Sequence, residues 1–211
     1  YAHPLPEGHR FPMLKYEMLP EQLVREGTCQ REQFFAPGRI LDQHVLRTHC
    51  SEYYKKLNAV SLTKKEIRRI GFPLSQELIE RECIIAQGTL KGCAFALKNG
   101  ISFNIAGGTH HAFFDRGEAF CLLNDQAIAA NYLLVTEQAK QILIIDLDVH
   151  QGNGTAALFR NNPKVFTFSM HGKANYPFQK ETSDLDIALE DNTKDNEYLD
   201  ILALQLAHLF S

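Results

Sequence analysis

The chain has 211 residues, of which 45% are hydrophobic and 22% are charged, and its formal net charge is −3, values that are typical of a globular domain. Lysines and arginines are scattered along it rather than clustered, which argues against direct binding to nucleic acid. No apolar run approaches the roughly 20 residues that cross a bilayer, and the five cysteines include no CxxC pair, so we expect a cytoplasmic protein without a membrane span or a disulfide framework.

The sequence shows no internal repeat, low-complexity tract or flexible linker, so we expect a single domain over residues 1–211. It starts with "YAHPLPEGHR", which has no initiator methionine, and it finishes in an apolar helix-forming segment at 196–210. A helix with so broad an apolar surface needs a sheet or another helix against it. We therefore expect a chain that is truncated at both ends.

Helical and extended patterns alternate along the chain from residue 75 onwards. In chain order we predict a largely buried helix at 75–98, begun by Ser75 and ended by Gly100, a strand in "ISFNIAGG" at 101–108, a helix at 122–135, a strand at 142–148, a short helix at 155–160, a strand at 165–169 and a helix at 196–210. Strands that alternate with helices build parallel sheets covered on both faces. The predicted fold is α/β, with three αβα layers and a mainly parallel central sheet.

Polar side chains stand at the carboxyl ends of all three predicted strands. They are His110 and His111 after the first strand, Asp146, Asp148 and His150 at the second, and His171 after the third. Ligands of open α/β sheets bind at this edge, although a lone histidine beside a turn is more often a hydrogen-bonded loop residue than a catalyst. The three groups together predict a functional site, and His171 has the weakest case.

The second group alternates along the chain, so an extended backbone would point Asp146, Asp148 and His150 to one side. Two adjacent carboxylates repel one another, and a divalent cation or a pair of histidines relieves that repulsion. Zn²⁺ accepts a carboxylate oxygen and an imidazole nitrogen, which makes Asp148 and His150 the natural ligand pair. Asp146 then remains to orient His110 or His111. The alternative is a loop whose carboxylates cap the next helix or meet solvent.

Three segments resemble the zinc-dependent histone deacetylases and their bacterial relatives in the arginase/deacetylase fold. They are "GGTHHAFFDRGEAFCLLND" at 107–125, "IIDLDVHQGNGT" at 144–155 and "FTFSMHGKANYPF" at 166–178. The short motifs "DRG", "HQGNG" and "YP" most resemble those of the class IV branch and of related bacterial proteins. The resemblance implies an arginase/deacetylase-like fold and a hydrolase that removes acetyl or acyl groups from lysine side chains or small amines.

Carried over residue by residue, the resemblance assigns Zn²⁺ binding to Asp148 and His150. It assigns to His111 the role of general base, which takes a proton from metal-activated water and later protonates the leaving amine. His110, oriented by Asp146, assists electrostatically.

The same resemblance implies a narrow substrate channel and a second ion site. Asn153 matches the polar residue behind the general base, Phe120 and Tyr176 match the channel walls, and Gly108 matches a substrate-binding position. Ala119 stands where the family usually has glycine at the channel rim. A structural K⁺ or Na⁺ ion is implied, held by Asp146, Asp148, His150, Ser169 and Met170.

Two family elements have no counterpart in residues 1–211, namely an aspartate that supplies a third metal ligand and a tyrosine that hydrogen-bonds the developing oxyanion. Loss of an oxyanion donor alone costs about a hundredfold or more in rate. We therefore expect an active parent enzyme, and we expect residues 1–211 alone to be inactive or nearly so.

Other functions compete with this interpretation. A degenerate or truncated domain would bind acylated ligands or partners without turnover. A ureohydrolase of the arginase type would need more aspartate ligands than the single "DxDxH" segment offers, and neither GxGxxG nor a P-loop supports nucleotide binding. The expected partner is an acylated lysine peptide or an acetylated small amine, without direct contact to nucleic acid or membrane.

Overall fold

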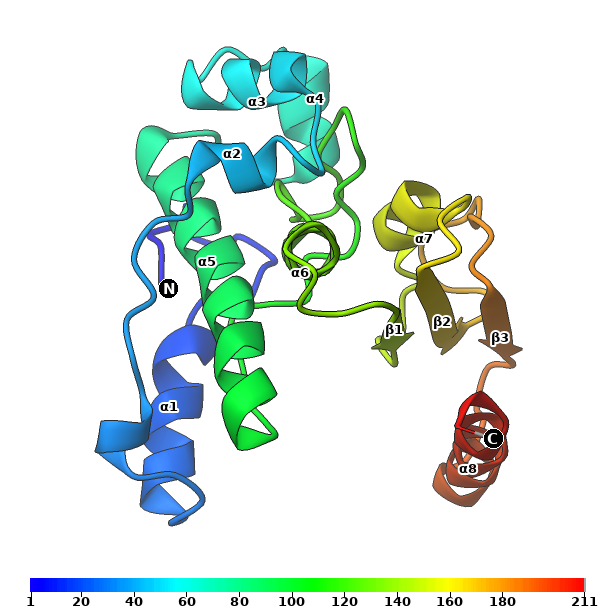
Figure 1. Ribbon diagram of the computed structural model, residues 1–211. Helices are drawn as coiled ribbons and strands as arrows, with labels where there is room; N and C mark the ends of the chain where they lie inside the picture. The colour runs from blue at the N-terminus through cyan, green and yellow to red at the C-terminus, as the bar shows by residue number, and fades with distance from the viewer. Residues whose placement is uncertain (211) are drawn as a thin grey trace. The chain divides into compact units, whose positions relative to one another are not determined.

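The computed structural model describes residues 1–210, which fall into two compact units, 1–140 and 141–210 (Figure 1). The first unit is helical. Its elements are α1 (Lys15–Arg25), the 3-10 helix η1 (Arg31–Gln33), α2 (Asp42–Val45), α3 (Ser51–Asn58), α4 (Lys64–Ile70), α5 (Gln76–Asn99) and α6 (Asp125–Val135). None of the helices in the described residues is long and apolar enough to cross a membrane.

Helix α5 is the centre of the first unit's core and confirms the predicted helix at 75–98. It begins where the Ser75 hydroxyl accepts a hydrogen bond from the Leu78 N–H, and it ends at Gly100, whose φ of +93° favours glycine. Leu78 and Ile79 are fully buried, and burial of each stabilises the fold by roughly 1.5–3 kcal/mol. The helix packs against α3 and α6, whereas Leu97 near its end is exposed.

The second unit contains the sheet. Its elements are β1 (Ile142–Asp146), α7 (Asn153–Phe159), β2 (Val165–Gly172), β3 (Leu185–Leu189) and α8 (Asp195–Leu209). The strands are parallel in the order β1-β2-β3, and α7 packs on β2 (Figure 1). The register aligns Asp146, Ser169 and Asp186 in one row across the three strands. The parallel sheet that the sequence predicts is therefore confirmed, and this row places polar groups at the end of β1, in the middle of β2 and near the start of β3.

The strand predicted at 101–108 is wrong. Residues 101–104 have no regular structure, and Ile105 and Ala106 form a turn. The Asn104 amide donates hydrogen bonds to the Ile85 carbonyl at 2.9 Å and to the Thr89 hydroxyl at 2.7 Å, which ties the segment to α5. Within the described residues no strand pairs with this segment. Its β-branched and aromatic residues therefore do not form the backbone hydrogen bonds of a sheet.

Other boundaries differ more modestly. The helix predicted at 122–135 begins only at Asp125, because Asn124 is its N-cap. The strand predicted at 142–148 ends at Asp146, whereas the strand predicted at 165–169 continues to Gly172 and so contains His171 instead of preceding it. Strand β3 and helices α1 to α4 have no counterpart in the sequence prediction. The five cysteines, all in the described residues, form no disulfide, as expected.

Candidate active site

The first unit carries the paired histidines on a buried segment. His110 and His111 are 7% and 4% exposed, and their ring centroids lie 4.1 Å apart at an interplanar angle of 50°. They follow a turn rather than the predicted strand. Gly108, predicted to bind substrate, has a φ of +88° and donates its N–H to the Asp125 carboxylate. The structure therefore brings the two histidines together in a site shielded from solvent.

Phe120 stands in an aromatic cluster of the first unit. Its ring centroid lies 5.0 Å from that of Phe72 and 5.1 Å from that of Phe11, and the Arg10 guanidinium lies 4.8 Å from its centroid. The Phe120 N–H donates to the Ile70 carbonyl at 2.6 Å, at the end of α4. These contacts fix the backbone of Phe120, and its place in a channel wall stays a prediction.

Ala119 precedes Phe120 in a strained conformation, with a φ of +44°. We expect Ala119→Gly to stabilise the protein by up to about 1 kcal/mol, because glycine adopts positive φ without steric cost. The melting temperature should then rise by roughly 2–4 °C. Ala96→Gly, inside α5, is the matched control and should lower it, since glycine weakens a helix interior. A fall in melting temperature for Ala119→Gly would contradict the strain argument.

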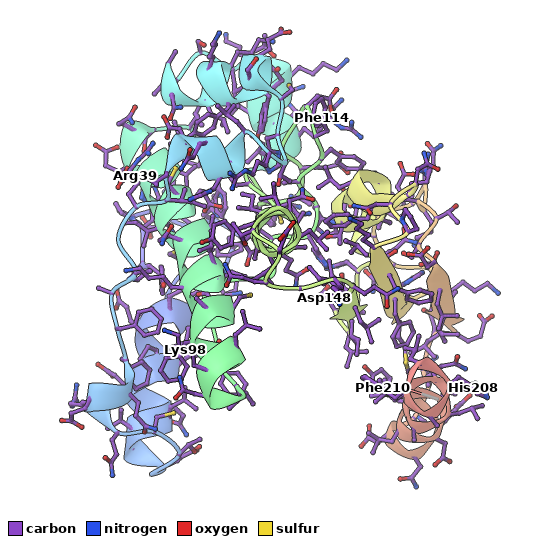
Figure 2. All side chains as sticks on the ribbon, in the orientation of Figure 1. Arg39, Lys98, Phe114, Asp148, His208 and Phe210 are labelled. Carbon is purple, nitrogen blue, oxygen red and sulfur yellow. The ribbon has the colours of Figure 1, made fainter. Side chains whose placement is uncertain are left out.

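The second unit carries Asp146, Asp148 and His150, and here the chain turns instead of staying extended. Asp146 is the last residue of β1, and its Oδ1 accepts the Asp148 N–H at 3.0 Å. Asp148 Oδ1 in turn accepts the His150 N–H at 2.8 Å. Two successive side-chain turns of this kind replace the strand geometry that the alternation predicts. Asp148 lies just past β1 and is exposed (Figure 2).

The predicted ligand pair converges despite this turn. His150 Nδ1 lies 3.1 Å from Asp148 Oδ1. Two ligands at 2.0–2.2 Å from a tetrahedral zinc stand roughly 3.3–3.6 Å apart, so the oxygen and the nitrogen lie slightly closer together than two ligands of one ion. Within residues 1–210 no group of three or more His, Cys, Asp or Glu residues is placed to hold a metal. The donors present thus fit zinc as two ligands of a set.

Asn153, Ser169, Met170 and His171, which were also predicted in the second unit, are buried. Asn153, the first residue of α7, is 3% exposed, and its Oδ1 accepts the Gly154 N–H at 3.0 Å. The Ser169 hydroxyl lies 3.0 Å from His171 Nδ1, and Met170 between them is also buried. Burial lowers the pKa of His171, so this ring is neutral near pH 7. The monovalent cation site at Ser169 and Met170 stays a prediction.

Tyr176, predicted as a channel wall, lies beside the predicted metal ligand. Its ring centroid is 6.0 Å from that of His150, edge to face, and 6.4 Å from that of Phe178, which is 91% exposed. The loop that carries it is fixed from within, because Lys180 Nζ donates to the carbonyls of Asn175 at 2.6 Å and Pro177 at 2.7 Å. Burial lowers the pKa of Lys180.

Lys180→Met should loosen this loop, because it leaves the carbonyls of Lys173, Asn175 and Pro177 without this donor. We expect a local loss on the order of 1–3 kcal/mol, seen as faster amide hydrogen exchange across residues 173–178. Lys173→Met is the matched control, since Lys173 pairs with Glu190 between exposed side chains, where ion pairs contribute little. Equal exchange in the two variants would show that Lys180 does not order the loop.

The comparisons with known proteins identify the family. A family model described as the histone deacetylase domain matches residues 9–211. The chain belongs to the histone deacetylase family. It is 45% identical over 212 residues to an uncharacterized protein of Picosynechococcus sp., covering 100% of this chain and 70% of that protein. It is 27% identical over 220 residues to the acetoin utilization protein AcuC of Staphylococcus aureus, covering 94% and 56%.

Solved structures place this family member in its fold. An HDAC homolog from Aquifex aeolicus superposes with a TM-score of 0.82 at 23% identity, over 98% of this chain and 61% of that chain. An HDAC homolog complexed with SAHA gives a TM-score of 0.82 at 24% identity, over 96% and 60%. The predicted arginase/deacetylase-like α/β fold is confirmed. The chain spans about three fifths of the length of these two structures.

Sequence reasoning missed a residue that holds the segment of the predicted metal ligands in this histone deacetylase family member. Gln151 is 1% exposed, and its side chain donates to the Glu181 carbonyl and to Asp186 Oδ1, each at 2.8 Å. Its Oε1 accepts the Glu181 N–H at 2.8 Å. The residue after His150 is thereby tied to β3 and the segment before it. A single buried glutamine leaves no periodic signal, so this role could not be predicted from the sequence.

Proposed function

We propose that the protein is a zinc-dependent amide hydrolase that removes acetyl or longer acyl groups from lysine side chains or small amines. Membership of the histone deacetylase family supports the hydrolase class. The observation that carries the zinc proposal is the 3.1 Å approach of His150 Nδ1 to Asp148 Oδ1, which presents two suitable donors to one ion. We also propose that residues 1–211 belong to one histone deacetylase domain, since the family model covers 9–211.

The proposed division of labour follows from the chemistry of each side chain. Asp148 and His150 hold zinc, which when bound polarises the acyl carbonyl and lowers the pKa of water toward about 7. His111 is the general base and later the acid that protonates the leaving amine, and its burial keeps bulk water from competing for the proton. His110 is assigned electrostatic assistance, and Asp146 and Asn153 are assigned supporting polar roles for the two histidines.

The proposed substrate is a linear acylated amine. Phe120, Tyr176 and Gly108 are its proposed contacts, and the Tyr176 ring stands edge to face with that of His150. One solved HDAC homolog is complexed with SAHA, which supports ligand binding by this fold. K⁺ or Na⁺ near Ser169 is proposed as a structural ion. A cytoplasmic location is proposed from the absence of disulfides among the five cysteines.

Two protein ligands hold zinc weakly, so we propose that residues 1–211 by themselves show little turnover, as the ligand count in the described residues suggests. The full-length protein is therefore the right sample for the test. Acetyl-lysine peptide, N-acetylated diamine and longer acyl-lysine peptides are assayed with zinc-loaded protein, before and after chelation. We expect chelator-sensitive release of the free amine from at least one of them. Stoichiometric zinc with no turnover of any would favour a binding domain instead.

A further inference from the structure

The segment that carries His110 and His111 is hydrogen-bonded at both of its ends to buried side chains outside it. We propose that Asp125, Asn124 and His49 are positioning residues that fix the backbone of residues 108–113 and so set the direction of both histidine rings. This inference rests on the proposed function, in which those rings move the proton. None of the three residues is placed to touch substrate, since they are 1%, 0% and 0% exposed.

Asp125 holds the beginning of the segment. Its Oδ1 accepts the Thr109 N–H at 2.8 Å and the Gly108 N–H at 3.1 Å, and the Thr89 hydroxyl donates to its Oδ2 at 2.5 Å. The close approach of the Asp125 carboxylate requires a glycine at position 107, because a Cβ on Gly107 would stand 2.7 Å from Asp125 Oδ2. Gly107 and Gly108 thus allow the buried carboxylate of Asp125 to hydrogen-bond the backbone directly before His110.

Asn124 and His49 hold the other end. Asn124 Nδ2 donates to the Ala112 carbonyl at 3.2 Å, while its Oδ1 caps α6 by accepting the Ala127 N–H at 3.0 Å. His49 Nδ1 donates to the Phe113 carbonyl at 2.8 Å, and its Nε2 accepts the Asn124 N–H at 3.0 Å. Complete burial lowers the pKa of His49 to about 4, so the ring is neutral and fills both roles at once.

These hydrogen bonds make the start of α6 a rigid support for residues 108–113. Asn124 and Asp125 are consecutive, yet one holds residue 112 and the other holds residues 108 and 109. His110 and His111 lie between these two points of attachment. A misplacement of about 1 Å at a catalytic group can cost on the order of 100-fold in rate. Fixing both ends therefore protects catalysis in a way that the buried position of the rings alone does not.

The test compares Asp125→Asn and Thr109→Val with wild type in the full-length protein. Asparagine keeps the shape of Asp125 but replaces one acceptor oxygen by a donor, and valine removes only the Thr109 hydroxyl. We expect amide exchange at residues 108–113 to rise on the order of tenfold, which corresponds to one lost hydrogen bond. We expect kcat to fall by roughly 10–100-fold with KM little changed and with the zinc content unchanged. Asp191→Asn, an exposed position, is the matched control.

The outcomes separate this inference from the proposed function. Unchanged exchange and unchanged kcat in folded Asp125→Asn would overturn the inference, and so would a fall in zinc content that accounts for the loss of activity. If Asp125→Asn does not fold, the milder Thr109→Val and the opposite end, tested by His49→Gln, decide in the same way. The exchange measurement needs no substrate, so a wild type without hydrolysis would sink the proposed function and leave the exchange result to decide the inference.

Discussion

Replacing His111 with glutamine is expected to lower kcat for acyl-lysine hydrolysis by roughly 10²–10⁴-fold, the usual contribution of a general base. Glutamine fills a similar volume and hydrogen-bonds, but it cannot take up and return a proton near pH 7. The 4% exposure of His111 leaves little room for bulk water to replace it in that role. The zinc content should stay unchanged, because His111 is not among the proposed ligands. Steady-state kinetics and metal analysis on one sample measure both effects.

The matched control is His208→Gln, on the exposed surface of α8, which should leave kcat unchanged. His110→Gln should cost less than His111→Gln, because His110 is proposed to assist electrostatically and not to carry the proton. Equal losses at the two positions would require the roles to be shared or exchanged. Full activity in the folded His111→Gln variant would remove the general base from the mechanism.

Replacing Asp148 with asparagine is expected to lower zinc affinity by more than 100-fold, and activity with it, since groups that merely orient a metal ligand already account for about 10–100-fold. The substitution isolates the charge, because the asparagine carbonyl can still accept the His150 N–H that Asp148 Oδ1 accepts at 2.8 Å. The turn therefore persists while the anionic ligand is lost. Competition with a chromophoric zinc chelator measures the affinity.

Asp191→Asn is the control here as well, because it removes one exposed carboxylate of the same unit without touching the ligand pair. Wild-type affinity in Asp148→Asn would mean that the carboxylate acts only through its hydrogen bond to the His150 backbone. That result would favour the alternative given by sequence alone, in which these carboxylates serve the loop and not a metal.

The sequence predicted those helices and strands whose ends and periodicity depend on residues close to them in the chain. Helix α5 was predictable because Ser75 caps it, an apolar periodicity runs along it and Gly100 ends it. The strand at 101–108 was predicted wrongly because its β-forming residues are outweighed by Asn104, which bonds to α5. Tertiary contacts of this kind leave no trace in a propensity pattern. Strand β3 was missed because its five residues are few and are flanked on both sides by acidic residues, which are more typical of a loop.

The candidate site was likewise only partly predictable from the sequence. The residue types and their order predicted Asp148 and His150 as metal ligands, which stays a prediction, and the structure brings these two side chains within 3.1 Å of each other. The reason offered for that approach was wrong, because side-chain turns at Asp146 and Asp148 replace the extended geometry. Asp125 and Asn124 were missed, although an Asn-Asp pair directly before an apolar helix is a recognisable N-terminal signal.

The most direct test is a crystal structure of the zinc-loaded, full-length protein with anomalous data at the zinc edge. The account predicts one peak at about 2.0–2.2 Å from both a carboxylate oxygen of Asp148 and a ring nitrogen of His150. A catalytically active crystal form whose zinc peak lies away from these two side chains would contradict it.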